Sequence, residues 1–286
     1  MSRNKDRLGS GESTPEATSP PVAAMDSNIF SFVAPTEFVK LPSEGRHYSP
    51  DHPLFNQQTI EIKQMTAKEE DILTSMTLLQ NGLALERLLD SIIVDKNIRA
   101  SSLFVGDRNA IVISARVSGY GNIYRTEITC PECVTQQKHN FNLNDAEIRT
   151  TTQILSMLPS GINVTDEGLY SVLLPKSQLT IVLRLLTGGD ENQLSTAIET
   201  NKKQKSEKLV TTQLAYMISS VNGNSTREAI EYVSNNLPSS DSAFLRSIYK
   251  KIIPNVDLNL SFSCENCPHT DNMEVPLTAE FFWPEQ

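Results

Sequence analysis

Residues 124–143, YRTEITCPECVTQQKHNFNL, carry the pair Cys130 and Cys133 between two stretches that predict β-strands. Residues 257–275, DLNLSFSCENCPHTDNMEV, repeat this arrangement around Cys264 and Cys267. The two pairs account for all 4 cysteines of the 286-residue chain. Two intervening residues let a tight turn aim both sulfurs of a pair at one ion about 2.3 Å away. Each pair therefore predicts a zinc knuckle at the tip of a β-hairpin.

Two knuckles supply four thiolates, which is the closed tetrahedral set of a structural zinc site. We expect Cys130, Cys133, Cys264 and Cys267 to hold one structural Zn²⁺. Residues 134–263 separate the pairs, so the simplest architecture is a split zinc ribbon with a long insertion. The closure cost of a loop rises by only about 0.6 kcal/mol per doubling of its length. A structural zinc supplies on the order of 10 kcal/mol, so such a long closure is feasible.

Three alternatives to zinc compete for the cysteines. Four thiolates also bind iron–sulfur clusters, a CxxC pair can perform redox chemistry, and small buried thiols can pack without metal. Redox chemistry is disfavoured, because it needs a reactive thiol at a helix N-terminus. Catalytic zinc is disfavoured too, since four thiolates leave no open position for water. His139 and His269 lie near the knuckles and are expected at the surface or against the ligands.

The composition limits the classes of protein to which this chain can belong. The chain is 38% hydrophobic and 21% charged, with a net charge of -9, so it can bury a core but repels nucleic-acid phosphates. The clearest basic run, Lys202 to Lys208, is interrupted by Glu207 and predicts a solvated helix face. No apolar run reaches the roughly 18 residues of a membrane span, and no secretory signal is expected at the N-terminus. We therefore expect a reducing cytoplasm and no membrane partner.

The N-terminal part divides into a tail and an arm. Residues 1–28 are rich in Ser, Thr, Pro, Gly and Glu and predict a disordered tail. Residues 29–58 form a proline-rich stretch in which Pro42, Pro50 and Pro53 disfavour helix and predict an extended arm. This arm either packs across its own domain or docks into a neighbouring subunit.

Residues 59–145 predict a strand, three helices and the first knuckle. The strand is expected over 59–64, and Thr66 with Glu69 forms a capping box for a helix that ends near Leu79. Further helices are expected over 83–95 and 103–118. For the last of these, the alternation of apolar residues from 111 to 117 makes a strand the alternative.

Residues 146–255 predict a mixed, then helical, insertion, and residues 256–286 predict the second knuckle hairpin. The fold class is thus α+β: a split four-cysteine zinc ribbon of β-hairpins, a three-helix N-terminal unit and a helical insertion. The expected strands are 170–174, 179–185, 257–262 and 273–282, and the expected helices are 191–204, 207–221, 226–236 and 240–252.

Several distinctive strings stand within Phe38–Cys133: Leu41-Pro42-Ser43 with Gly45 and Tyr48, EIKQMTAKEEDIL over 61–73, LFVGDRNA over 103–110, SGYG over 118–121 and CPEC over 130–133. These strings resemble the T4-type phage baseplate family, in particular the baseplate hub assembly proteins of contractile-tailed phages. The resemblance covers about a third of the chain.

The resemblance implies a non-enzymatic role in building the hub of the tail baseplate, by binding other hub proteins in the host cytoplasm. It leaves open whether the protein stays in the virion tail or departs like a chaperone, and it transfers no contact residue. Arg108 is either an interface residue or part of a local salt bridge.

Two other classes of function are weighed against this assembly role. A nucleic-acid-binding zinc ribbon would need a basic face, which Glu132, Glu265 and Asp271 oppose. An enzyme with a structural zinc would need a cleft with convergent polar groups, and the sequence contains no GxxxxGK[ST], GxSxG or HExxH motif.

Overall fold

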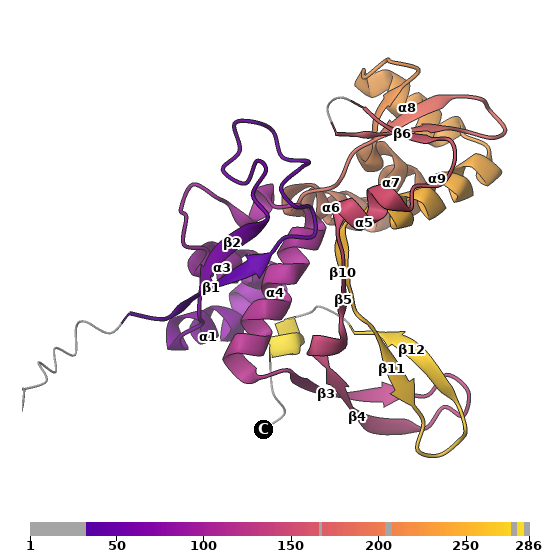
Figure 1. Ribbon diagram of the computed structural model, residues 1–286. Helices are drawn as coiled ribbons and strands as arrows, with labels where there is room; N and C mark the ends of the chain where they lie inside the picture. Colours follow the sequence, from indigo (N-terminus) through magenta and orange to yellow (C-terminus); the bar gives the residue numbers. More distant parts are fainter. Residues whose placement is uncertain (1–32, 166–167, 204–207, 276–278, 283–286) are drawn as a thin grey trace, which may run out of the picture. The chain divides into compact units, whose positions relative to one another are not determined.

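The computed structural model describes residues 33–165, 168–203, 208–275 and 279–282 (Figure 1). The predicted tail over 1–28 lies outside these residues. The chain divides into Met1–Val33 and Ala34–Gln286, and the second unit carries the elements described below. Its buried side chains form two hydrophobic cores, one built from both ends of the unit and one built from residues 162–252.

The proline-rich arm packs on its own chain. It begins with a strand that the sequence did not predict, β1 (Thr36–Lys40), which pairs antiparallel with β2 (Thr59–Lys63). The intervening turns bury Leu41, Tyr48 and Leu54 in the first core. The arm is therefore less extended than predicted, because these spaced apolar side chains fold it back against the helices.

The N-terminal helices complete the first core. The capping box of Thr66 and Glu69 is present, but the helix predicted to reach Leu79 breaks at Ser75, whose backbone is extended (ψ 105°). The segment 103–118 is helical, so the strand alternative is wrong. The elements are α1 (Ala67–Thr74), α2 (Met76–Gln80), α3 (Ala84–Ile92), η2 (Ala100–Ser102) and α4 (Val105–Tyr120).

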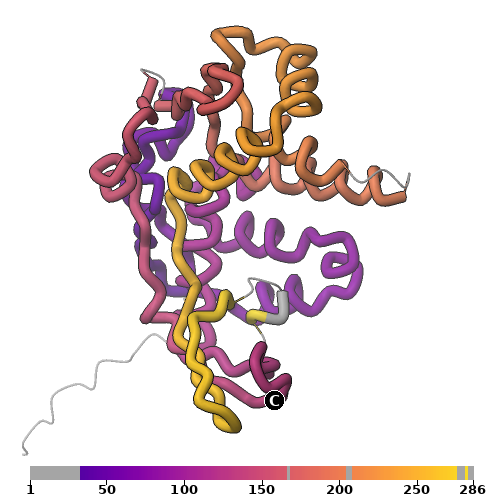
Figure 2. The backbone as a smooth tube through the Cα atoms, turned by 90° about the vertical axis from the view of Figure 1, so that its right-hand side faces the viewer, coloured from indigo at the N-terminus to yellow at the C-terminus, as the bar shows by residue number. Residues whose placement is uncertain are grey.

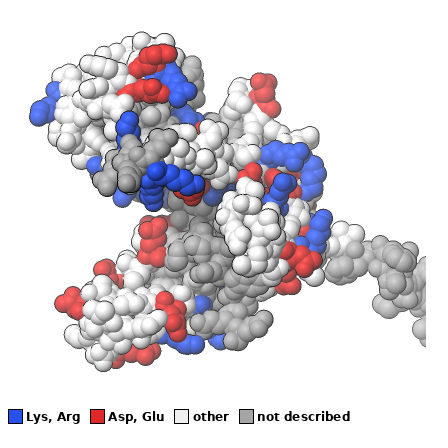
Figure 3. Space-filling view, turned by 180° about the vertical axis from the view of Figure 1, so that it is seen from behind, with Lys and Arg blue, Asp and Glu red and all other residues white. Residues whose placement is uncertain are grey.

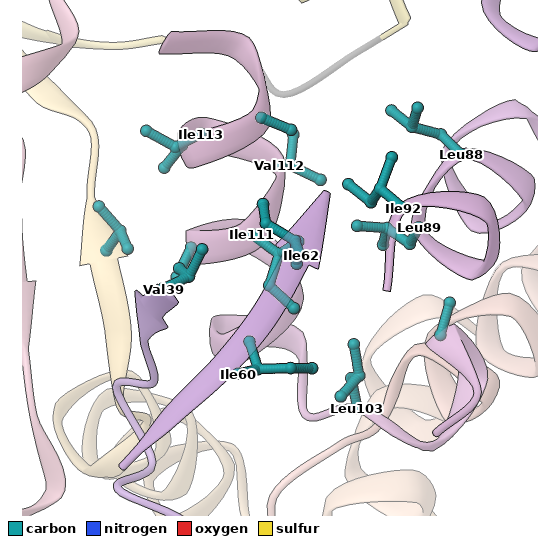
Figure 4. Close-up of a cluster of buried hydrophobic side chains, with 14 of the residues drawn as sticks. Val39, Ile60, Ile62, Leu88, Leu89, Ile92, Leu103, Ile111, Val112 and Ile113 are labelled. Carbon is teal, nitrogen blue, oxygen red and sulfur yellow. The ribbon is translucent and has the colours of Figure 1, made fainter. Parts of the chain in front are cut away.

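Helix α4 is buried on several faces, which explains the ambiguous apolar pattern in its sequence. Ile111, Val112 and Ile113 are consecutive and all buried. Figure 4 shows Ile111 beside Ile62 of β2 and Val112 on the side of the helix toward Ile92 of α3, whereas Ile113 points to the opposite side. A helix with neighbours on several sides loses the clean apolar stripe of a surface helix.

The two cysteine-bearing hairpins follow the predicted layout. Strand β3 (Ile123–Thr129) pairs with β4 (Gln136–Asn142), and β11 (Asn259–Ser263) pairs with β12 (Thr270–Glu274). The two hairpins lie side by side in both views (Figures 1 and 2). Their inward faces carry Tyr124, Phe141 and Phe262, which are all buried.

A short pair of strands closes the insertion. After η3 (Leu143–Asp145), strand β5 (Glu147–Arg149) pairs antiparallel with β10 (Asn255–Asp257), although more than a hundred residues separate them. Figure 1 shows the two strands side by side where the chain leaves for the insertion and returns from it. Neither the β5 strand nor its pairing was predicted from the sequence.

The insertion combines a four-stranded antiparallel sheet of order β6-β7-β8-β9 with helices around the second core. The helix predicted over 207–221 is wrong at its end, because Ile218–Val221 forms the edge strand β9 and pairs with β8. The elements are α5 (Thr151–Ser156), β6 (Ile162–Val164), β7 (Tyr170–Leu173), β8 (Thr180–Leu183), α6 (Gly188–Lys203), α7 (Leu209–Met217), β9 (Ile218–Val221), α8 (Arg227–Asn236) and α9 (Ser239–Ile252).

The C-terminal strand predicted over 273–282 is also wrong. Strand β12 ends at Glu274, and η4 (Ala279–Phe282) is a 3-10 helix. Phe281 and Phe282 are both fully buried in the first core. Consecutive residues of a strand point to opposite faces, so a one-sided hairpin strand could not bury both rings.

Candidate metal centre

The turns at the two hairpin tips place the cysteines. Cys130 follows β3, and its backbone N–H donates to the carbonyl of Thr135 (2.9 Å). Cys264 follows β11, and its N–H donates to the carbonyl of His269 (2.9 Å). In the first turn Val134 has a left-handed backbone (φ 56°), a conformation that costs a β-branched residue energy. The two tips thus use the same hydrogen-bonded turn, although only the first contains this strained residue.

The four sulfurs converge on one point. Sγ of Cys130 lies 3.8 Å from Sγ of Cys267, and Sγ of Cys133 lies 3.6 Å from Sγ of Cys264. All four sulfurs lie within 4.8 Å of one another. A tetrahedron with metal–sulfur bonds of about 2.3 Å has edges of about 3.8 Å. The arrangement therefore fits a tetrahedral metal ion, whereas a disulfide would need sulfurs about 2.05 Å apart.

The surroundings of the sulfurs change their acidity unequally. Hydrogen bonding with the hydroxyl and backbone of Thr135 lowers the pKa of the Cys133 thiol to about 6. The backbone hydrogen bond of His269 lowers the pKa of Cys267, but burial and the neighbouring sulfurs outweigh it and raise that pKa to about 12. The neighbouring sulfurs thus disfavour ionisation of Cys267, and a cation beside the sulfurs would offset this effect. This donor chemistry suits a divalent metal.

Side chains from β4 hold the hairpins together. Gln137 donates from Nε2 to the carbonyl of Ser263 (3.1 Å) and accepts at Oε1 from the N–H of Glu265 (3.0 Å). Both partners flank Cys264. No local pattern signals this role of Gln137, because its partners lie more than 120 residues away along the chain.

The two histidines near the knuckles have different surroundings. The ring of His139 packs edge-on against Phe141 and Phe262, with centroids 4.6 and 5.2 Å away. Its Nε2 lies 3.2 Å from the carbonyl oxygen of Ser261, which links the first hairpin to the second. Nε2 of His269 is buried and has no hydrogen-bond partner among the described residues.

A second polar cluster joins two of the strings that resemble the baseplate family. Asp107, fully buried in the first turn of α4, accepts from the N–H (2.9 Å) and hydroxyl (2.6 Å) of Ser43 and from the hydroxyl of Tyr48 (2.8 Å). Burial raises the pKa of Asp107, and these bonds only partly offset the rise. The adjacent Arg108 pairs with Glu191 (2.6 Å) in the first turn of α6, so its salt bridge is long-range and not local as considered from the sequence. This cluster fixes the arm onto α4.

A serine–histidine pair joins the arm to η2. Nε2 of His52 lies 3.0 Å from Oγ of Ser102, but Nδ1 accepts from the N–H of Leu54 and the Ser102 hydroxyl donates to the carbonyl of Arg99. These bonds place the histidine proton on Nε2, where it donates to the serine. A nucleophilic serine needs the opposite tautomer, so this geometry is that of a structural link.

The surface is mixed in charge and includes apolar grooves. Figure 3 shows Lys and Arg interspersed with Asp and Glu on one face. A groove of about 720 Å³ beside β5 is lined by Ile148, Met157 and Leu158 together with Arg149 and Lys251. Within the described residues, no helix combines the length and apolar character needed to cross a membrane.

Comparison with known proteins gave one match. A family model described as T4 bacteriophage base plate protein matches residues 34–283, which include both knuckles and the whole insertion. Neither the curated proteins nor the solved structures gave a match.

Proposed function

We propose that this chain, which belongs to the T4 bacteriophage base plate protein family, is a non-enzymatic component or assembly factor of the baseplate hub. The observation that carries this proposal is the extent of the family match, residues 34–283. The chain acts by binding other baseplate proteins, and it does so in the host cytoplasm during tail assembly. As part of this proposal, the chain is organised into a tail, an arm, a three-helix unit, an insertion and a second knuckle.

The cysteine cluster serves this role as a structural metal site. Cys130, Cys133, Cys264 and Cys267 would hold one Zn²⁺, whose charge would stabilise all four as thiolates. Four sulfur ligands complete the tetrahedral set, so the site suits cross-linking better than catalysis. Such a cross-link would fix the second hairpin and the buried C-terminal phenylalanines against the rest of the first core.

Co-purification tests the assembly role. The tagged full-length chain, recovered from infected cells before lysis, should bring other baseplate proteins with it. Recovery of the chain alone, or with nucleic acid only, would contradict the proposal. A tagged chain expressed without infection is the control, because it shows which host proteins bind non-specifically.

Metal analysis of paired variants tests the shared site. The wild-type chain should contain about one zinc, and either double variant, Cys130→Ser with Cys133→Ser or Cys264→Ser with Cys267→Ser, should contain almost none. Both pairs are needed because each supplies only two of the four ligands. Zinc near zero in the wild type, or half retained in each variant, would argue against one shared ion.

A further inference from the structure

Two polar side chains, one from each knuckle, meet beside the sulfurs. Nδ2 of Asn266 donates to Oγ1 of Thr135 (3.0 Å), although the two residues lie 131 positions apart in the sequence. Oγ1 of Thr135 lies 3.3 Å from Sγ of Cys133. The backbone N–H of Asn266 donates to Sγ of Cys264 (3.4 Å), and its Nδ2 donates to Sγ of Cys133 at the longer distance of 3.9 Å. This Thr135–Asn266 pair therefore touches one sulfur of each hairpin.

We propose that the Thr135–Asn266 pair is a latch that aligns the two knuckles and positions Cys133 and Cys264 for the metal. The inference rests on the proposed metal centre. The latch is independent of an ion, because its hydrogen bond joins two neutral side chains. Together with the bonds of Gln137 to Ser263 and Glu265, it joins the two hairpin tips through hydrogen bonds between protein groups.

The physical benefit of this latch is preorganisation. Metal binding to two hairpin tips that move independently would include the entropic cost of aligning them. A latch that docks the tips in the apoprotein removes part of this cost from the binding step. Outer partners that orient metal ligands typically contribute about 10- to 100-fold in metal affinity. Loss of the latch should therefore weaken binding while leaving all four ligands in place.

Zinc affinity, measured by competition with a chromophoric chelator, tests the latch on the full-length chain. Asn266→Ala and Thr135→Val should each weaken zinc binding about 10- to 100-fold. Thr135→Ser keeps the hydroxyl and should restore affinity close to that of the wild type. The double variant Asn266→Ala with Thr135→Val should lose little more than either single variant, because each removes the same hydrogen bond. Asn272→Ala, on the same hairpin but away from the sulfurs, is the matched control.

Cobalt substitution separates positioning from ligand loss. The Co²⁺ forms of the latch variants should keep the absorption bands of a four-sulfur tetrahedral site, because the ligands are unchanged. Zinc affinity within twofold of the wild type in both single variants would overturn the latch while leaving the metal centre intact. A wild-type chain that binds neither zinc nor cobalt would instead overturn the metal centre and the latch with it.

Discussion

At the scale of single residues, two buried carboxylates differ in how their charge is stabilised. Burial tends to raise the pKa of Glu69, but hydrogen bonds from Lys63, Ser91 and Thr66 outweigh it and lower that pKa to about 2. Asp107 receives only neutral donors from Ser43 and Tyr48, and burial raises its pKa. Glu69 therefore favours the folded state as an anion, whereas burial disfavours the ionised form of Asp107.

Replacing Glu69 by Gln should change how stability depends on pH. The pKa of Glu69 is about 2 in the folded chain, below its ordinary value of 4.5. Its contribution to the free energy of unfolding is therefore present above pH 4.5 and is lost as pH falls towards 2. This contribution is roughly 3 kcal/mol. Urea unfolding between pH 7 and pH 2 should show Glu69→Gln less stable at pH 7 and less sensitive to acid.

Glu70→Gln is the matched control for this change, because Glu70 lies in the same helical turn but is exposed. Its urea midpoint should follow the wild type across the pH range. If acid lowered the free energy of unfolding of Glu69→Gln as much as that of the wild type, groups other than Glu69 would cause the pH dependence.

At the scale of elements, α4 is the helix against which the rest of the first core is arranged. Its first turn carries Asp107, which fixes the arm, and its later turns carry Arg116, whose fully buried guanidinium donates to the carbonyls of Phe281 (2.9 Å) and Gly121 (2.7 Å). At Gly106, the same helix also contacts the segment that leads into β10. A Cβ atom on Gly106 would lie 1.9 Å from the carbonyl oxygen of Pro254.

Gly106→Ala should therefore destabilise the chain by about 3 kcal/mol, because the added methyl group must displace rigid backbone. Gly119→Ala in the same helix is the control. Its Cβ would meet only the flexible end of Met65, and alanine favours helix, so its free energy of unfolding should stay within about 1 kcal/mol of the wild type. Equal stabilities of the two variants would show that α4 can move away from Pro254.

At the scale of the whole molecule, two long-range links close the insertion. The β5–β10 pair closes it near its base, and the cysteine cluster joins the hairpins that flank it. The second core is made only of residues 162–252. The links and the insertion's core thus rest on different interactions, and loss of the proposed metal should affect them unequally.

Hydrogen exchange after zinc removal checks this expectation. Amides of β11, β12 and the two turns should exchange about tenfold faster in the stripped protein, because the hairpins lose their cross-link. Amides of β8 and α9 should be unchanged within about twofold, since the second core lacks metal ligands. The variant Cys130→Ser with Cys133→Ser should show the stripped pattern with or without chelator. If amide exchange became faster to the same extent in both cores, the metal would support the fold as a whole.

Local spacing in the sequence determined several turns and helices of this protein. The CxxC spacing predicted the two hairpin tips, the box of Thr66 and Glu69 predicted the start of α1, and the helices predicted over 226–236 and 240–252 correspond to α8 and α9. These signals are local because a turn or helix cap is completed within a few residues. The residue types at the cysteine site followed from them.

Tertiary structure alone decided the features whose partners are distant in sequence. Strands β5 and β10 have three residues each, too few to show a period, and they form because they meet each other. Residues 218–221 pair with β8 instead of extending α7, and the two C-terminal phenylalanines fill the first core. Arg116 and the Thr135–Asn266 pair likewise depend on contacts across more than 100 residues. Burial and long-range hydrogen bonds fixed these features, and neither leaves a pattern among neighbouring residues.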